Sequence, residues 1–449
     1  MRFLIALWVL KFTSWLISIV AKGRGTALPG TIALKIDPKF VSHIKNLDPE
    51  KTVFVTGTNG KSTTTRLINH VIKESGMKVV SNLAGANLLD GVSVALGKDC
   101  TMFGKLKSDV ILLEVDERFL EYIIEQLPAK KLCVVNIQKD QVQRNGEPEY
   151  IRRKIAKSVN KDMTVFLNGN EPNALSLGEL AGRCISFGVE ENSRSFDKQD
   201  DFFSVTMPCP VCHDAIKFNK YNIDNVGPFK CTGCGFGTGD IDYIAENIDF
   251  DAKTFSCNGD TYTFNYNTPH FLYCFIATLA IARELGISVE VIQKAFANYT
   301  VKSNRLDTVH VAGMDIKYLG IKQENPETVQ SAINVIANDP NEKVLVLGFY
   351  ELADFAPHYT NTFYSFDCTF LKLIKSNISK CICPADFVAY DEGMRVLYDG
   401  LGADKLIILH TSNEADIFNE ISKCECKNIY FITWLHKFDR IIQYAEKHE

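Results

Sequence analysis

The sequence predicts two consecutive α/β domains, the first with a phosphate-binding loop and a short cysteine-rich insert. Three observations predict this fold. A glycine-rich loop lies between an apolar strand-like run and a helical pattern, such runs alternate with helical patterns in two separate regions, and four cysteines have the spacing of metal ligands. Because this alternation builds parallel sheets covered by helices, we expect ligands at the carboxyl ends of the strands.

Length and composition exclude several classes of protein. The chain has 449 residues, enough for two or three domains that each bury a core. Hydrophobic residues make up 46% and charged residues 23%, which is typical of a soluble globular protein. The net charge of −5 argues against a broad nucleic-acid surface. The cysteines are spread along the chain, which favours a reducing cytoplasm over a secreted disulfide scaffold.

The N-terminal segment, residues 1–45, is an apolar helix followed by a lead-in to the first domain. Its apolar run, residues 3–20, is interrupted by Lys11 and is followed by a poor signal-peptide cleavage site. A spanning helix needs about 20 residues with few charges. We therefore expect a helix that packs on the protein or, as the alternative, lies on a membrane surface.

The loop Thr56–Thr63, with the sequence TGTNGKST, carries the strongest functional signal. It follows the apolar run Val53–Val55 and precedes a helical pattern. Small residues let backbone N–H groups approach a phosphate, and the helix N-terminus adds a partial positive charge. Lys61 is placed to reach terminal phosphates and the Ser62 hydroxyl to ligate Mg²⁺; an ordinary strand-to-helix turn is the alternative. The predicted nucleotide-binding residues of the loop are Gly57, Thr58, Asn59, Gly60, Lys61, Ser62 and Thr63.

The first domain, residues 46–300, is predicted to contain a mostly parallel sheet. We expect strands at 53–55, 79–80, 110–115, 132–136 and 164–167. Polar residues follow several of them: Asn82, Glu114, Asp116, Asn136 and Asp140. Glu114 comes directly after an apolar run, so it is the first candidate for a Mg²⁺ ligand. Glu117 is expected in a solvated acidic loop, and Asn136 fits a site or a loop equally well.

Four cysteines define the insert, at about residues 203–240. Cys209-x₂-Cys212 and Cys231-x₂-Cys234 are two knuckles of the kind that complete a tetrahedron around Zn²⁺. Four thiolates leave no open position, so the ion is expected to be structural. The pairs Cys381/Cys383 and Cys424/Cys426 are instead expected to be thiols on one face of a strand.

The second domain, residues 301–449, alternates strands and helices again. Its expected strands are 344–347, 381–383, 406–409 and 429–432. Arg305 lies at the junction of the two domains. It is a candidate either for contacting a nucleotide or for pairing with a carboxylate.

These features together resemble the Mur ligases and their folylpolyglutamate synthase relatives. The phosphate-binding loop, Glu114 at a strand end and the second α/β domain carry this resemblance. Residues 85–91 (GANLLDG), 114–117 (EVDE) and 136–147 (NIQKDQVQRNGE), with the four-cysteine insert, are similar to the MurT family. Members of that family are ligase subunits of lipid II isoglutaminyl synthase, whose partner is a GatD-like glutaminase. The resemblance runs from about Gly23 to the C-terminus.

The resemblance implies a Mur-ligase-type fold and an ATP-dependent amidation. ATP would phosphorylate the α-carboxyl of D-glutamate in the stem peptide of lipid II, and ammonia from the glutaminase would convert the acyl phosphate to D-isoglutamine. It implies catalytic roles for Lys61 and Glu114, Asn136 and Arg305 near the nucleotide, and ATP, Mg²⁺ and Zn²⁺ as cofactors. Asp367 would orient the imidazole of the glutaminase, with a surface aspartate at a helix start as the alternative.

Two other functions stay open at this point. One is an amino-acid-adding ligase of the Mur or folylpolyglutamate type, which needs no glutaminase; the cysteine insert argues against it. The other is a non-catalytic nucleotide-binding scaffold; the intact Lys61, Ser62 and Glu114 argue against that. The resemblance also implies a cytoplasmic location, with a peripheral position at the inner membrane face as a further expectation.

Overall fold

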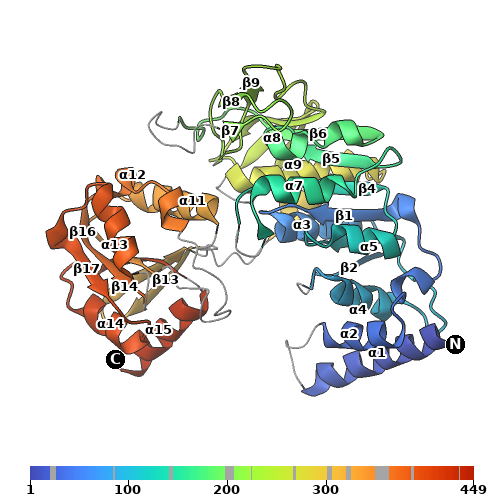
Figure 1. Ribbon diagram of the computed structural model, residues 1–449, viewed down its shortest axis with the longest axis horizontal. Coiled ribbons are helices and arrows are strands. Elements are labelled where there is room, and N and C mark those ends of the chain that lie inside the picture. Colours follow the sequence, from blue (N-terminus) through green and yellow to red (C-terminus); the bar gives the residue numbers. More distant parts are fainter. Residues whose placement is uncertain are drawn as a thin grey trace. The chain divides into compact units, whose positions relative to one another are not determined.

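The computed structural model divides the chain into two compact units. It describes residues 1–20, 27–83, 86–140, 145–197, 207–223, 225–265, 269–300, 306–319, 325–348, 364–385, 389–433 and 435–448. The first unit comprises Met1–Gln138 and Glu147–Thr300, and the second comprises Lys139–Gly146 and Val301–Glu449. Each unit is built around its own sheet (Figure 1).

The sheet of the first unit has nine strands in the order β12-β11-β10-β6-β5-β4-β1-β3-β2. The strands from β10 to β2 are parallel, and β11 and β12 add an antiparallel edge. Their bounds are β1 Thr52–Thr56, β2 Val79–Ser81, β3 Val110–Glu114, β4 Lys131–Val134, β5 Thr164–Asn168, β6 Arg183–Val189, β10 Tyr243–Asp249, β11 Thr254–Cys257 and β12 Asp260–Thr263. β1 lies between β4 and β3, and the loop that follows it lies at the carboxyl edge of the parallel strands.

Helices cover both faces of this sheet (Figure 1). One layer contains α3, α9 and α10, which contact one another, and α5 contacts α7 in the other. The bounds are α3 Lys61–Glu74, α4 Leu89–Asp99, α5 Leu120–Gln126, α7 Pro148–Ala156, α8 Pro172–Leu175, α9 Pro269–Glu284 and α10 Val289–Asn298. Parallel strands buried on both faces are apolar throughout, which explains the continuous runs in β1 and β3.

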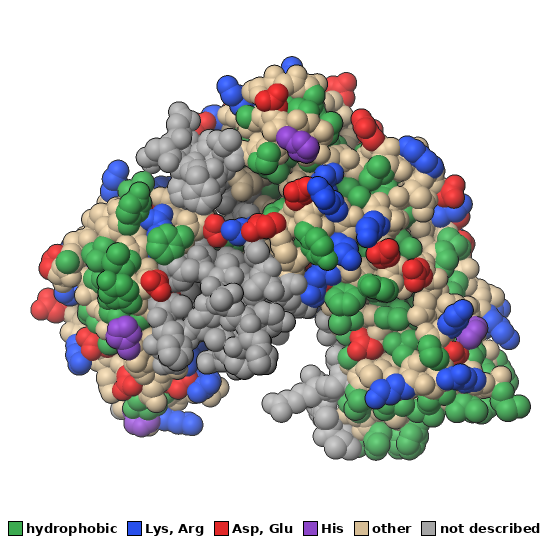
Figure 2. All heavy atoms as spheres, in the orientation of Figure 1, with side chains coloured by type: hydrophobic (Ala, Val, Ile, Leu, Met, Phe, Trp, Pro, Cys, Tyr) green, Lys and Arg blue, Asp and Glu red, His purple; other side chains and the backbone are tan. Residues whose placement is uncertain are grey.

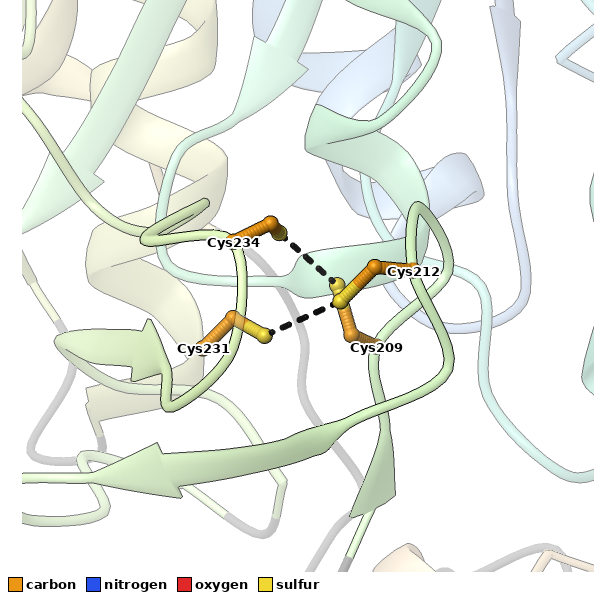
Figure 3. Close-up of side chains that lie close together, drawn as sticks. All are labelled: Cys209, Cys212, Cys231 and Cys234. Atoms are coloured by element: carbon orange, nitrogen blue, oxygen red, sulfur yellow. Dashed lines mark hydrogen bonds between the residues drawn. The ribbon is translucent and has the colours of Figure 1, made fainter.

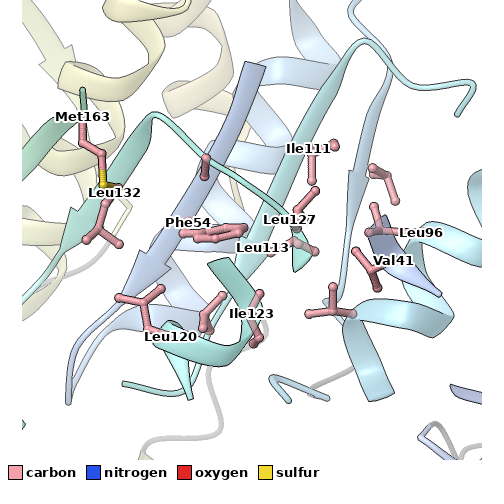
Figure 4. Packing of buried hydrophobic residues seen from close by; sticks show 14 of the residues in the cluster. Val41, Phe54, Leu96, Ile111, Leu113, Leu120, Ile123, Leu127, Leu132 and Met163 are labelled. Atoms are coloured by element: carbon pink, nitrogen blue, oxygen red, sulfur yellow. The ribbon is translucent and has the colours of Figure 1, made fainter. Parts of the chain in front are cut away.

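The core on the α5 side of the sheet is continuous from β4 to the N-terminal helices. Phe54 lies in register with Leu113 on one side and with Leu132 on the other. Figure 4 shows these side chains packed with Leu120 and Ile123 of α5. This packing sets the position of β1, and therefore of the loop after it.

The N-terminus forms two helices on the same unit. α1 spans Arg2–Val20 and α2 spans Leu28–Ile36, and both pack beside α4. Residues Arg2–Ile19 are long and apolar enough to cross a membrane by length and composition, and 22% of this stretch is buried.

The second unit has a six-stranded sheet in the order β13-β14-β18-β15-β16-β17. β13 and β14 are antiparallel, and the other pairs are parallel. The bounds are β13 Leu306–Val311, β14 Met314–Leu319, β15 Lys343–Leu347, β16 Ile378–Pro384, β17 Leu406–Leu409, β18 Asn428–Ile432, α11 Pro326–Ala337, α12 Leu371–Ile374, α13 Ala389–Tyr398, α14 Glu414–Ser422 and α15 Leu435–Lys447. Two separate apolar clusters fill its two faces.

The predicted fold class is confirmed. All nine expected strands are present as β1 to β5 and β15 to β18. β6 and β10 to β12 were not predicted, because their alternating or interrupted patterns lack a long apolar run. The cysteine-rich segment forms a small separate sheet of β7 Met207–Pro208, β8 Ala215–Phe218 and β9 Phe229–Cys231.

Candidate active site

The loop between β1 and α3 has the backbone geometry of an anion-binding turn. Gly57 and Gly60 have φ angles of +121° and +88°, in the left-handed region that favours glycine. A Cβ atom on Gly57 would lie 2.5 Å from the carbonyl oxygen of Asn136. Lys61 is the first residue of α3, so the helix N-terminus opens onto the loop.

Asn136 braces this loop from the end of β4. Its Oδ1 accepts a hydrogen bond from the backbone N–H of Asn59 at 2.8 Å, and its Nδ2 donates to the Asn59 carbonyl at 2.9 Å. The N–H of Thr58 donates to the Asn136 carbonyl at 3.0 Å. Because its amide group is used in this way, Asn136 shapes the loop that would hold the phosphates.

Gln138 adds a second set of contacts to the same loop. Its side-chain oxygen accepts from Asn59 Nδ2 at 2.8 Å, and its backbone N–H donates to Thr58 Oγ1 at 2.9 Å. All these residues are buried. Sequence reasoning missed Gln138, although it lies two residues after Asn136 on the same segment.

Lys61 forms a buried ion pair with Glu117. The Lys61 ammonium lies 2.9 Å from Glu117 Oε2, and it also donates to the carbonyl oxygens of Gly57 and Thr58. The side chains of Lys61 and Glu117 are 11% and 5% exposed. The expectation that Glu117 lies in a solvated loop is therefore wrong, because the segment after β3 folds back beside the loop.

Glu114 and Ser62 lie on neighbouring elements of the site. Glu114 ends β3 opposite Val55, and Asn82 holds its backbone through two hydrogen bonds of 2.9 Å and 2.8 Å. Among the described residues the Glu114 carboxylate makes no hydrogen bond or ion pair. Ser62 is exposed in the first turn of α3. Carboxylate and hydroxyl oxygens are ligands that Mg²⁺ accepts, so the two residues are of the types expected at a Mg²⁺ site.

Asp116 is a structural neighbour of the site. Its carboxylate is buried and pairs with the Arg118 guanidinium at 3.0 Å. Burial raises the pKa of Asp116, but the hydrogen bonds and charge of Arg118 outweigh it and hold the pKa below its usual value. Asp116 is therefore ionised, and its charge is neutralised within its own turn.

Glu171 supports the segment that braces the loop. Its carboxylate accepts hydrogen bonds from the backbone N–H groups of Asn173, Ala174 and Ile137, each at 2.9 Å. It thereby caps α8 and holds Ile137, between Asn136 and Gln138. Complete burial raises the pKa of Glu171 to about 7, although the three N–H groups act in the opposite direction.

The N-terminal part of α9 lies beside Gly60 of the loop. A Cβ atom at Gly60 would be 3.4 Å from Cys274 Sγ and 3.6 Å from His270 Nε2. Sequence reasoning assigned His270 no role in the site. Its contact with Gly60 arises from tertiary packing across more than 200 residues and has no local sequence signal.

The four cysteines of the insert converge (Figure 3). Their sulfur atoms all lie within 4.8 Å of one another, with Cys209 and Cys234 Sγ atoms at 3.9 Å and Cys212 and Cys231 Sγ atoms at 3.4 Å. The N–H groups of Val211 and Gly233 donate to Cys209 and Cys231 sulfur, each at 3.4 Å. Burial opposes ionisation of Cys231, but the backbone N–H groups of Cys234 and Gly233 and the neighbouring thiols lower its pKa to about 7. Such a cluster is suited to a soft divalent ion such as Zn²⁺. Within the described residues it is the one group of this kind.

Asp367 lies in the second unit, at the end of the short 3₁₀ helix Tyr364–Asp367. Its Oδ1 lies 3.0 Å from Lys139 Nζ, and both side chains are partly exposed. Asp367 thus has a cationic neighbour. That it orients the imidazole of a glutaminase stays a prediction. Arg305 lies outside the described residues.

Two family models match parts of the chain. Residues 55–209 match the model of the Mur ligase middle domain, and residues 323–434 match that of the MurT ligase C-terminal domain. The first match contains the loop, Glu114 and Asn136, and the second contains Asp367. The chain is therefore similar to the Mur ligases in its first unit and to the MurT ligases in its second.

Individual relatives show the same similarity. The chain is 28% identical over 418 residues to the lipid II isoglutaminyl synthase subunit MurT of Streptococcus pneumoniae (strain ATCC BAA-255 / R6), covering 91% of this chain and 90% of that protein. It is 26% identical over 363 residues to the MurT subunit of Staphylococcus aureus (strain COL), covering 80% of each. Among solved structures, a pseudomurein peptide ligase type C from Methanothermus fervidus superposes with a TM-score of 0.64 at 15% identity, covering 92% of this chain and 81% of that one. This last likeness establishes the Mur ligase fold of the MurT-like chain.

Proposed function

We propose that the chain is the ATP-dependent ligase subunit of a lipid II isoglutaminyl synthase. The observation that carries this proposal is similarity to MurT subunits along 80–91% of the chain, through both units. Its reaction is amidation of the α-carboxyl of D-glutamate in the stem peptide. The carboxylate oxygen attacks the terminal phosphorus of ATP and ADP leaves; ammonia then attacks the acyl phosphate, and phosphate leaves to give the amide.

The residues of the loop fit the phosphates of ATP. Gly57 and Gly60 adopt positive φ angles and carry no Cβ that would cover the neighbouring backbone N–H groups, and the N-terminus of α3 adds a partial positive charge. Lys61 would exchange its Glu117 contact for a phosphate oxygen and neutralise charge that develops during transfer. Asn136 keeps the loop in this shape.

Ser62 and Glu114 are the residues that would hold Mg²⁺. An ion bound there would neutralise the charge of the phosphates. The four cysteines of the insert would hold Zn²⁺ with no position left for a substrate, so that ion would stabilise the insert and take no part in the reaction. The amido nitrogen would come from glutamine, hydrolysed by a glutaminase partner.

One assay separates this function from its alternatives. The purified chain, with its glutaminase subunit, is supplied with ATP, Mg²⁺, lipid II and either glutamine, ammonium or a free amino acid. With glutamine and with ammonium we expect ADP release and conversion of the stem-peptide carboxyl to an amide. Mass spectrometry detects the amide. Addition of the free amino acid to the substrate would establish an amino-acid-adding ligase. No ADP release under any condition would establish a scaffold.

A further inference from the structure

The outward face of α1 is a continuous apolar stripe. The side chains of Ile5, Trp8, Phe12, Trp15, Leu16 and Ile19 are between 43% and 61% exposed. Positions 5, 8, 12, 15/16 and 19 recur every three or four residues, which places these side chains on one side of the helix. A surface helix of a water-soluble protein normally presents polar residues on its outward face. A helix that is apolar on both faces contacts a second apolar environment in addition to the protein core.

The inward face of the same helix is packed on the protein. Ala6, Leu7 and Leu10 are fully buried, and Leu10 packs so closely on α4 that a Cβ at Gly97 would lie 2.8 Å from it. Lys11 is the one charged residue in α1 after Arg2, and its ammonium donates to the carbonyl of Cys100 at 2.7 Å. This contact caps the end of α4 and holds α1 flat on the unit. A spanning orientation would break it, so the structure favours a helix that lies on a surface.

A neighbouring turn extends the apolar surface beyond the helix. Trp8 Nε1 donates to the Met102 carbonyl at 2.9 Å, which fixes the turn beside α1. Met102 and Phe103 in this turn are 54% and 73% exposed. Figure 2 shows hydrophobic side chains gathered along the lower edge of the molecule, over α1, with Lys and Arg side chains nearby.

The charge of this region is opposite to that of the rest of the chain. Residues 1–45 contain seven Lys or Arg and one Asp, a net charge of +6 in a chain whose total is −5. Lys98, Lys105 and Lys107, which flank the apolar turn, are also exposed. An apolar stripe with a cationic border matches an anionic bilayer surface. A second copy of the chain is a poorer match for this surface, because it would bring two cationic borders together.

We propose that α1 and the turn at Met102–Phe103 dock the first unit onto the surface of an anionic bilayer. α1 lies in the plane of the surface, with Trp8, Phe12 and Trp15 in the headgroup region. This would hold the chain where a lipid-linked substrate is found, and in that respect it deepens the proposed function. Its test uses no catalytic measurement, so either proposal can fail without the other.

Vesicle flotation with the purified full chain tests the proposal. Vesicles of phosphatidylcholine alone are compared with vesicles that also contain phosphatidylglycerol. We expect binding to the anionic vesicles that weakens as salt is raised. Two of the three tryptophans lie on α1, so binding should also shift the tryptophan emission to shorter wavelength.

The double variant Phe12→Ser with Trp15→Ser should bind at least about tenfold more weakly, because it removes two apolar side chains from the stripe. The exposed Tyr122→Ser is the matched control and should bind as the wild type does. Unchanged melting temperatures would show that both variants fold. The proposal would be overturned if the wild-type chain did not bind the vesicles, or if the double variant bound them equally well. Salt-independent self-association without vesicle binding would also overturn it.

Discussion

The Lys61 ammonium and the Glu117 carboxylate lie 2.9 Å apart beside the glycine-rich loop Thr56–Thr63, and both side chains are almost fully buried. A buried ion pair is costly to break by removing one partner, because the other charge is left without compensation. A phosphate group is the kind of ligand that can replace Glu117 as the partner of Lys61. The pair therefore keeps the lysine at the loop with its charge neutralised.

Lys61→Ala should reduce ATP-dependent turnover by about 10²–10³-fold, as expected for removal of one group that stabilises charge in phosphoryl transfer. Lys73→Ala, an exposed lysine on the same helix, is the control and should keep its activity. ADP release under saturating ATP measures both. Wild-type turnover by Lys61→Ala would remove Lys61 from the catalytic assignment.

Gly57→Ala should abolish nucleotide binding. The new Cβ would lie 2.5 Å from the Asn136 carbonyl, and the φ angle of +121° is unfavourable for alanine. Gly76→Ala is the matched control, because its φ is also positive but no atom lies within 4 Å of the added Cβ. Calorimetric titration with an ATP analogue gives the dissociation constants. If Gly57→Ala bound as tightly as Gly76→Ala, the loop would not be the nucleotide site.

Cys231→Ser should lower the affinity for zinc by at least about tenfold and the melting temperature by several degrees, since a thiolate ligand is lost and metal binding is coupled to folding. Cys184→Ser, which changes an exposed thiol outside the cluster, should alter neither. Metal content by mass spectrometry and thermal unfolding with and without chelator provide the measurements. A wild-type chain purified without zinc, and indifferent to added zinc, would argue against the site.

Asp367→Asn should abolish glutamine-dependent turnover and preserve turnover with ammonium, if Asp367 orients the imidazole of the glutaminase. The amide oxygen can still accept from Lys139, so the local contact is retained. Asp439→Asn, an exposed residue of α15, is the control. Lys139→Met tests the structural alternative: an equal loss in that variant, with both nitrogen sources, would mean that Asp367 only supports its own unit.

Glu171 should make stability depend on pH. Its folded pKa of about 7 lies above the ordinary value of 4.5. Its stabilising contribution is therefore complete below pH 4.5 and is lost as the pH rises through 7, by an amount on the order of 3 kcal/mol. Glu171→Gln resembles the protonated form and should lack this contribution to the pH dependence. Urea unfolding of both chains at pH 5, 6, 7 and 8 measures the difference; parallel pH profiles would contradict the raised pKa.

Much of the fold could be predicted from local patterns. Continuous apolar runs identified β1 and β3 because both are buried on two faces. The loop from Thr56 to Thr63 was recognisable because its glycines, lysine and serine are close in sequence. Strands such as β10, which lies near the sheet edge and in which polar residues interrupt the apolar run, gave no comparable signal.

By itself the sequence determined the α/β class, the glycine-rich loop from Thr56 to Thr63 and the spacing of the four cysteines, because each depends on residues within a few positions or on a regular period. Only the tertiary structure decided which distant side chains meet. Glu117 reaches Lys61 across 56 residues and Asn136 reaches Asn59 across 77. These contacts follow from β1 lying between β3 and β4. Strand order is set by packing of the whole sheet, so no local pattern encodes it.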